Sequence, residues 1–296
     1  MITFNKTDTP IIELYNKDKL NKDFKFNKDA TPDKILYLDN NDNKNMIINQ
    51  LEPFIPFPVI NNKERFSAFI HGNSHSGKSC MASNLIFLLN KNIKNIKFLY
   101  FTGVSLDKPL LKYFKYLFSD EDKNKLMLFT PKSFIDIKLF NDKNPKNKLK
   151  IPLTVDEIND IQLNNNNCDI CCIFDDIDNI NNKTIKFAIE NLEADIALTG
   201  RSHGKTGNIH FISISHVITA QTPRIRRLLL ETKWNIFNIK SQNDTHIKNL
   251  TKKLGYSDKL TNEIIKQKHN SGTYIMTFLS SSYPYIVFNK NNIIIE

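Results

Sequence analysis

The sequence lacks the features of a membrane or exported protein. It has no run of about 18 consecutive apolar residues, so no segment is expected to cross a bilayer as a helix. The amino-terminal stretch MITFNKTDTP contains no hydrophobic region of the kind that a secretory signal peptide carries. These absences predict an intracellular protein that does not associate with a membrane.

Cysteine is also scarce, with four residues in a chain of 296. Three of them, Cys168, Cys171 and Cys172, are close in sequence, but no second pair accompanies them. On a strand, Cys171 and Cys172 would point to opposite faces, which does not suit a shared metal ion. We therefore expect buried, reduced thiols, as in proteins of a reducing compartment.

Acidic residues are fewer than basic ones. The chain has 41 Lys and Arg against 31 Asp and Glu, which gives a formal net charge of +10 and a pI near 9.2. Such an excess favours polyanionic partners, and nucleic acid first among them. A solvated, lysine-rich surface in a sequence biased toward Asn, Lys and Ile is the alternative. Hydrophobic residues make up 40%, which is enough for a sizeable core.

One stretch, residues 72–79, reads G-x-x-x-x-G-K-S, which is a complete phosphate-binding loop. The apolar residues 66–70 before it predict a strand, and residues 81–89 after it predict a helix. The chemistry needs strand, loop and helix in this order, so the context supports the motif. A chance Gly- and Ser-rich turn after a strand is the alternative. The stretch predicts that the chain binds a nucleoside triphosphate.

Each residue type in this loop suits a triphosphate. Gly72 and Gly77 let the backbone wrap around an anion, and the amino end of the following helix adds a positive dipole. Lys78 would reach the β- and γ-phosphates, and the Ser79 hydroxyl would hold Mg²⁺. The residues expected to bind the nucleotide are Gly72, Asn73, Ser74, His75, Ser76, Gly77, Lys78, Ser79 and Cys80.

A second apolar segment ends in two carboxylates. Residues 170–174 are almost all apolar, as in a parallel strand covered on both faces, and Asp175 and Asp176 follow. In open α/β sheets, ligands bind at this carboxyl edge. Asp175 would hold Mg²⁺ through water, and Asp176 would orient and deprotonate the attacking water. The alternative is that the pair only marks the start of a helix.

The fold class follows from the alternation of strands and helices. Strands are expected at 96–101, 126–129, 170–174, 209–215 and 234–239, and helices at 110–118, 155–163, 183–197 and 222–233. This alternation predicts an α/β fold, with a mostly parallel central sheet flanked by helices. The residues between 79 and 175 leave room for an extra strand between the loop strand and the acidic strand, as in RecA-like, additional-strand P-loop NTPases. No N-K-x-D base-reading motif occurs in a plausible place, so ATP is the expected nucleotide.

We expect two parts along the chain. Residues 1–55 form a partly ordered N-terminal extension with a strand or two, and residues 56–296 form the ATPase domain. The motif-bearing core spans residues 60–240 of that domain. After the core, helices are expected around 244–254 and 258–268, followed by a hairpin-like pair of strands at 274–279 and 285–288.

Two further residues are candidates for the same site. His216 ends a predicted central strand, where a polar side chain can report the presence of the γ-phosphate. A histidine in a loop after a strand is the alternative. Arg201 lies in the loop before that strand and is a candidate to reach the nucleotide of a neighbouring subunit, where it would stabilise charge on the transferred phosphoryl group. A solvated charge is the alternative for Arg201.

Together these motifs resemble the FtsK–HerA superfamily, and most closely its viral genome-packaging ATPase branch in poxviruses, giant viruses and virophages. The pieces that carry the resemblance are GNSHSGKS at 72–79, CCIFDD at 171–176, GRSHG and NIHFISISH within 200–216, and ITAQTPRIRRLLLETKWNIFNI at 218–239. His216 stands where the family usually has glutamine, and residues 204–207 form a longer insertion.

The resemblance implies an oligomeric, ring-shaped, ATP-driven motor that moves double-stranded DNA into a preformed capsid, with ATP and Mg²⁺ as its ligands. It assigns catalytic roles to Lys78, Asp176, Arg201 and His216, and metal binding to Ser79 and Asp175. It also implies a location in the host-cell cytoplasm or virus factory, or in the virion. The alternatives are another additional-strand motor, such as a helicase or DNA-transfer pump, and a nucleotide-switched scaffold that binds nucleic acid.

The predicted helix at 222–233 carries Arg224, Arg226 and Arg227. In a motor of this kind they are candidates for the DNA grip or for the subunit interface, because a non-specific motor should contact phosphates and not bases. Arg224 and Arg227 share a helical face, and Arg226 lies off it. A basic, solvated face on a helix whose apolar residues point inward is an equally good interpretation.

Overall fold

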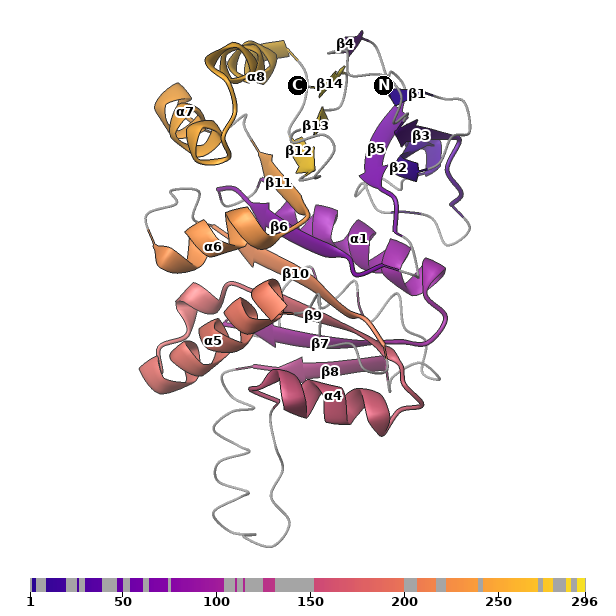
Figure 1. Ribbon diagram of the computed structural model, residues 1–296, viewed down its shortest axis with the longest axis vertical. Helices are drawn as coiled ribbons and strands as arrows, with labels where there is room; N and C mark the ends of the chain where they lie inside the picture. The colour runs from indigo at the N-terminus through magenta and orange to yellow at the C-terminus, as the bar shows by residue number, and fades with distance from the viewer. Residues whose placement is uncertain are drawn as a thin grey trace, which may run out of the picture. The chain divides into compact units, whose positions relative to one another are not determined.

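The chain forms two compact units in the computed structural model (Figure 1). One comprises Met1–Ile60, Ala68–Phe87 and His216–Glu296, and we call it the loop unit; the other comprises Asn61–Ser67 and Leu88–Ser215, and we call it the acidic unit. The residues that the structure describes are 2–3, 9–19, 26, 30–38, 47–49, 54–60, 64–73, 76–103, 110, 114, 125–130, 152–199, 207–216, 222–238, 242–270, 274–278, 286–288 and 292–295.

Strands and helices alternate through the middle of the chain. The strands are β1 (Ile2–Thr3), β2 (Thr9–Asn16), β3 (Lys34–Leu38), β4 (Ile47–Asn49), β5 (Phe54–Pro58), β6 (Ser67–His71), β7 (Ile96–Thr102), β8 (Leu126–Phe129), β9 (Asp169–Asp175), β10 (Ile209–Ser215), β11 (Trp234–Asn238), β12 (Tyr274–Phe278), β13 (Ile286–Phe288) and β14 (Asn292–Ile295). The helices of the described residues are α1 (Lys78–Asn92), α4 (Val155–Leu163), α5 (Lys183–Thr199), α6 (Pro223–Glu231), α7 (Asp244–Lys253) and α8 (Asp258–Asn270), with short 3₁₀ helices η1 (Lys17–Lys19) and η3 (Ile177–Asn179). The hydrogen-bonded strand orders are β1-β3-β2-β5 and β4-β14-β13-β12-β11-β6 in the loop unit, and β10-β9-β7-β8 in the acidic unit.

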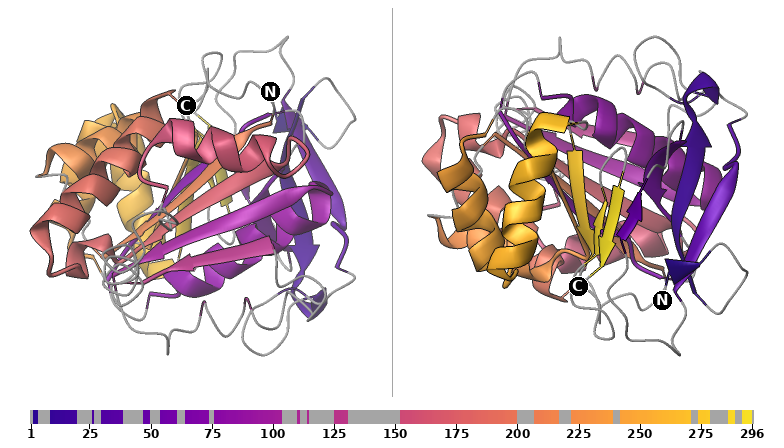
Figure 2. Two further views of the ribbon diagram at one scale, coloured as in Figure 1. Left: turned by 90° about the horizontal axis from the view of Figure 1, so that it is seen from below. Right: turned by 90° about the horizontal axis from the view of Figure 1, so that it is seen from above.

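The acidic unit is a parallel sheet with helices packed on it. In it β10, β9, β7 and β8 lie side by side and run parallel to one another (Figure 1). Both β9 and β10 are buried along nearly their whole length, as expected of parallel strands covered on both faces. Helix α4 packs on β9, α5 packs on β10, and the two helices contact each other, so they cover the same face (Figure 2). The predicted α/β fold is confirmed in this unit.

The loop unit contains strands of both orientations. Strand β11 runs parallel to β6, with Ile236 opposite Ile70. Beyond β11, strands β12, β13, β14 and β4 pair antiparallel in turn, which confirms the predicted hairpin-like pair as β12 and β13. Helix α6 begins within the range expected for it. Thr222 is the N-cap, its Oγ1 accepts from Ile225 N at 3.3 Å, and Pro223 takes the first helical position.

The amino-terminal sheet has an aromatic core of its own. The ring of Phe26 lies 4.5 Å from that of Tyr15 and 4.8 Å from that of Phe57. Phe26 also stacks on Phe87 of α1 at 5.4 Å, and its backbone N–H donates to Asn84 Oδ1 at 3.1 Å. The region before the phosphate loop thus packs on the helix that follows the loop. The predicted division of the chain near residue 55 remains a prediction.

Some sequence predictions fall outside the described residues. These are most of the helix expected at 110–118, together with Ser74, His75 and Arg201. Among the described helices, none combines the length and the apolar composition that crossing a membrane requires.

Candidate nucleotide-binding site

The phosphate-loop motif lies between β6 and α1, as its sequence context predicted. Every residue of β6 is buried, and Lys78 is the first residue of α1. Gly77 has a φ of 85°, a left-handed conformation that glycine adopts without strain. Its carbonyl accepts the first hydrogen bond of the helix, from Met81 N at 3.0 Å, and Ser76 N donates to Asn73 O at 3.2 Å within the loop. The loop therefore ends at a helix amino terminus, where backbone N–H groups favour an anion.

The side chain of Lys78 is folded into this loop. Lys78 is 6% exposed, and its Nζ donates to Gly72 O at 2.8 Å and to Asn73 O at 2.7 Å. A third contact joins Nζ to Nδ1 of His216 at 3.1 Å, across 138 residues of sequence. His216 directly follows β10 and belongs to the loop unit. The structure therefore brings together two of the residues that the sequence singled out.

His71, the last residue of β6, is buried with both ring nitrogens lacking a hydrogen-bond partner in the described structure. Its ring stacks between Phe69, at a centroid distance of 4.7 Å, and Phe237, at 5.3 Å. Burial, and then the charge of Lys78, lower the pKa of His71 to about 3, so the imidazole is neutral. His71 carries no sequence signal, because one histidine in an apolar strand does not reveal what surrounds its ring.

We expect His71→Phe to stabilise the protein, and more strongly in acid. Phenylalanine keeps the stack and removes two buried polar atoms, which should raise the free energy of unfolding by about 1 kcal/mol near pH 7.5. The pKa of His71 is about 3 in the folded state and 6.5 as its ordinary value, so the unfolded state binds more protons between these limits. Wild-type stability therefore falls as the pH is lowered from about 6.5 toward 3. The variant lacks this loss, so its advantage should reach about 3 kcal/mol at pH 5. Urea unfolding at both pH values measures it, and an equal or negative effect at pH 5 would contradict the burial of a neutral ring.

Strand β9 ends in the predicted acidic pair. Asp175 is its last residue and is 2% exposed. Tyr100 OH, from the neighbouring strand β7, donates to Asp175 Oδ2 at 2.6 Å. Burial and the Asp175 charge raise the pKa of Tyr100 above its ordinary value, so the hydroxyl remains a donor. Tyr100 therefore orients the carboxylate. Tyr100 was not predicted from the sequence, because its place beside Asp175 depends on the register between two strands.

Asp176 has an unusual backbone conformation. Its φ of 52° and ψ of 39° are left-handed, a region that costs most L-residues about 1–2 kcal/mol and that aspartate and asparagine tolerate best. Asp176 is 5% exposed and precedes η3, yet its side chain forms no capping hydrogen bond there. Strained backbone of this kind is concentrated at functional sites.

The end of β7 leaves no space for a side chain beside the acidic pair. Gly103 N donates to Asp175 O at 3.1 Å. A Cβ atom on Gly103 would lie 2.1 Å from the carbonyl oxygen of Asp176. Glycine is therefore required at residue 103 by the close approach of another backbone.

We expect Gly103→Ala to lower the free energy of unfolding by about 1–3 kcal/mol, because the added methyl group meets a backbone atom that has to move. Gly255→Ala is a useful comparison: Gly255 has a φ of 79°, so alanine is strained there by conformation and should cost about 1 kcal/mol. Urea unfolding measures both variants. Wild-type stability for Gly103→Ala would contradict the close contact with Asp176.

The arginines of α6 lie toward its solvent side. Arg226 and Arg227 are exposed and Arg224 is half-buried. The buried residues of the helix are Ile225, Leu228 and Leu229. Leu230, which is 55% exposed, lies one turn along from Arg226 and Arg227. The exposed face of α6 thus combines two positive charges with an apolar side chain.

The cysteine cluster is as predicted. Cys168, Cys171 and Cys172 are buried free thiols. Burial raises the pKa of the Cys171 and Cys172 thiols, so the thiolate form that binds metals is disfavoured. Across the described ranges, no group of three or more His, Cys, Asp or Glu side chains is arranged to hold a metal ion.

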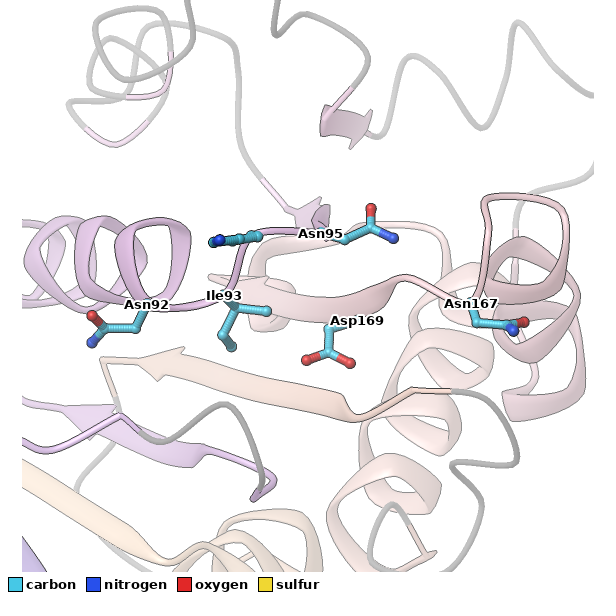
Figure 3. A pocket seen from close by; sticks show the side chains of 6 residues that line it. Asn92, Ile93, Asn95, Asn167 and Asp169 are labelled. Carbon is cyan, nitrogen blue, oxygen red and sulfur yellow. The ribbon is translucent and has the colours of Figure 1, made fainter.

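A cavity of about 300 Å³ lies at the amino end of β9 (Figure 3). It is lined by Asn92, Ile93, Lys94, Asn95, Asn167 and Asp169. Asp169 Oδ1 accepts from Asn208 N at 2.8 Å, and Oδ2 lies 3.3 Å from Nε2 of buried His210. His210 Nδ1 accepts from Phe66 N at 3.0 Å, so its proton is on Nε2 and it donates to Asp169. Because Asp169 begins β9 and Asp175 ends it, this cavity lies at the opposite end of the strand from the acidic pair.

No protein-family model matches the sequence. The chain is 24% identical over 249 residues to an uncharacterized protein, V3, of the Sputnik virophage, a match that covers 84% of this chain and 83% of that protein. The similar solved structures are distant. One is the genome packaging NTPase B204 from Sulfolobus turreted icosahedral virus 2 in complex with AMPPCP, with a TM-score of 0.43 and 12% identity over 76% of this chain and 97% of that one. Another is the cytoplasmic domain of the Thermomonospora curvata type VII secretion ATPase EccC, with a TM-score of 0.45 and 11% identity over 83% of this chain and 28% of that one.

The fold class follows from the chain's own elements. A buried strand, a phosphate loop and a helix follow one another in the loop unit. In the acidic unit, β10 pairs with β9 on one side, and Phe211 of β10 donates to Phe66 O, directly before β6, at 2.9 Å. The extra strand predicted between the loop strand and the acidic strand is therefore β10. The chain has the fold of an additional-strand P-loop nucleoside triphosphatase.

Proposed function

We propose that this chain is an ATPase that uses hydrolysis to move double-stranded DNA, in the packaging of a viral genome. The observation that carries the proposal is the phosphate loop, with the Lys78 ammonium held inside it by the Gly72 and Asn73 carbonyls. The loop supplies backbone N–H groups, a helix amino terminus and a buried positive charge for a triphosphate. Double-stranded DNA is proposed as the cargo because the sequence resembles viral genome-packaging ATPases.

In this proposal Ser79 and Asp175 hold the Mg²⁺ that accompanies ATP. A hydroxyl and a carboxylate are the hard oxygen ligands that Mg²⁺ prefers, and Mg²⁺ is commonly bound by one or two such groups together with substrate phosphates. The buried Asp175 fits this use, because Tyr100 fixes one of its oxygens as the second shell of a metal site does. The ion would neutralise charge on the β- and γ-phosphates.

Asp176 is assigned to the attacking water. A carboxylate one residue beyond the Mg²⁺ ligand can orient water and accept its proton. The left-handed backbone of Asp176 and the glycine requirement at residue 103 support a defined direction for this side chain. Arg201, which lies outside the described residues, is proposed to complete the site of a neighbouring subunit, and His216 to report whether a phosphate occupies the loop.

The proposed partners are duplex DNA and further copies of the chain, assembled as a ring that docks on a capsid. The net charge of +10 favours a polyanion, and the exposed face of α6 offers Arg226 and Arg227 to a phosphate backbone or to a neighbouring subunit. Contacts to phosphates and not to bases would suit a motor that moves DNA of any sequence.

The test is steady-state ATP hydrolysis with and without DNA, on a sample whose mass has been measured with an ATP analogue. We expect turnover that duplex DNA stimulates more than single-stranded DNA does, and a smaller stimulation when Arg226 and Arg227 are both changed to Ala. Preference for single strands would favour a helicase. Tight ADP retention without turnover would favour a nucleotide-switched scaffold. Loss of the assembled mass in the double variant would place these arginines at the subunit interface.

A further inference from the structure

The ammonium group of Lys78 is saturated in this structure. A lysine has three N–H donors and no acceptor. Its Nζ contacts Gly72 O at 2.8 Å, Asn73 O at 2.7 Å and His216 Nδ1 at 3.1 Å. A phosphate oxygen can therefore bind Lys78 at full strength only if one of these three contacts is exchanged for it.

Of the three acceptors, His216 is the one that can leave while the loop backbone stays in place. Two of the acceptors are carbonyls of the phosphate loop itself, and Asn73 O also accepts from Ser76 N at 3.2 Å. His216 contributes a side chain, exposed at the end of β10, so rotation about its own bonds breaks the contact. The exchange thus needs no rearrangement of the loop.

The contact also decides where the imidazole proton lies. Because the ammonium group can only donate, Nδ1 of His216 must accept, and the proton is on Nε2. Nδ1 of His216 and a phosphate oxygen are therefore alternative acceptors for the same N–H group of Lys78.

We propose that His216 is a positioning residue that holds Lys78 in the nucleotide-free loop and is displaced by a phosphate oxygen when nucleotide binds. The proposal rests on the proposed nucleotide binding and adds how occupancy of the loop is signalled. A direct phosphate sensor would strengthen nucleotide binding, whereas a residue that competes for Lys78 weakens it.

The two roles predict opposite changes in nucleotide affinity when His216 is replaced, so affinity measurements distinguish them. The probes are fluorescent methylanthraniloyl-ADP and the same label on a non-hydrolysable ATP analogue, titrated into wild type, His216→Ala and His216→Gln. If His216 competes with phosphate for Lys78, His216→Ala binds the ADP probe about fivefold more tightly, the effect of one hydrogen bond. Glutamine restores an acceptor for Lys78, so His216→Gln should return to wild-type affinity. Unfolding curves establish that both variants are folded.

Each remaining outcome overturns the proposal. Unchanged or weaker binding of the ADP probe by His216→Ala rules out the competition, and weaker binding of the ATP analogue alone makes His216 a direct sensor. Lys78→Ala in the same assay separates this inference from the proposed function. If wild type binds both probes and Lys78→Ala binds them poorly, a failure of the His216 variants rejects this inference alone. If wild type binds neither probe, both are rejected.

Discussion

Lys78→Ala is expected to reduce ATP hydrolysis by at least about a hundredfold, the usual effect of removing one donor that stabilises charge in a transition state. The Lys78 side chain is 6% exposed and its Nζ lies among loop carbonyls. Its charge is therefore weakly screened by water and acts strongly on a bound phosphate. Nucleotide affinity should also fall, because a charge-assisted hydrogen bond contributes about 1.5–3 kcal/mol. Steady-state turnover and titration with a labelled nucleotide measure the two effects.

Lys91→Ala is the matched control for this variant. Lys91 lies in the last turn of the same helix and is exposed, so its loss removes an equal charge far along α1 from the loop. It should leave turnover within a factor of about two, as expected for a screened surface charge. Turnover near wild type in Lys78→Ala would reject the assignment of this loop as the triphosphate site.

Asp176→Asn is expected to abolish hydrolysis while nucleotide binding is retained. The amide keeps the size of the carboxylate but cannot accept a proton from water, and general-base assistance is worth about 10²–10⁴ in rate. Asparagine also tolerates the left-handed φ of 52° at this residue, so the backbone should be preserved. The expected result is therefore a low kcat with nearly unchanged affinity and unfolding midpoint. Single-turnover hydrolysis and nucleotide titration on one sample measure both.

Two further variants separate the effect of the Asp176 carboxylate from the effect of its backbone conformation. Asp178→Asn removes a neighbouring exposed carboxylate and should turn over like wild type. Asp176→Ala should lose activity as well as stability, by about 1 kcal/mol, because alanine is strained in the left-handed region. Comparable turnover by Asp176→Asn and wild type would show that another group activates the water.

Local sequence patterns predicted most of the elements that carry the candidate site. The loop between β6 and α1 could be predicted from two glycines, a lysine and a serine at fixed spacing, since these residue types define the backbone path independently of distant residues. The start of α6 also depends on local residues. Thr222 accepts a hydrogen bond from a backbone N–H of the first turn, and Pro223 has no N–H that would need a partner. The acidic ending of β9 followed from a buried apolar run with carboxylates at its carboxyl end.

The residues that sequence reasoning missed are those whose role depends on distant partners. Tyr100 becomes a partner of Asp175 only through the register of β7 against β9. Phe26 joins the amino-terminal sheet to α1, although its surrounding sequence is polar and predicted only a partly ordered extension. The burial of His71 between two phenylalanines likewise requires β11 beside β6. None of these contacts leaves a periodic signal in the sequence.

The sequence by itself determined the phosphate loop, the acidic pair and the alternation of strands and helices, because turn chemistry and side-chain period act over a few neighbouring residues. Only the tertiary structure decided that Lys78 is held by His216, that Asp175 is oriented by Tyr100, and that Gly103 must lack a side chain. These features depend on which strands are neighbours and in what register they pair. That register is set by packing of the whole sheet, and no short stretch of the chain encodes it.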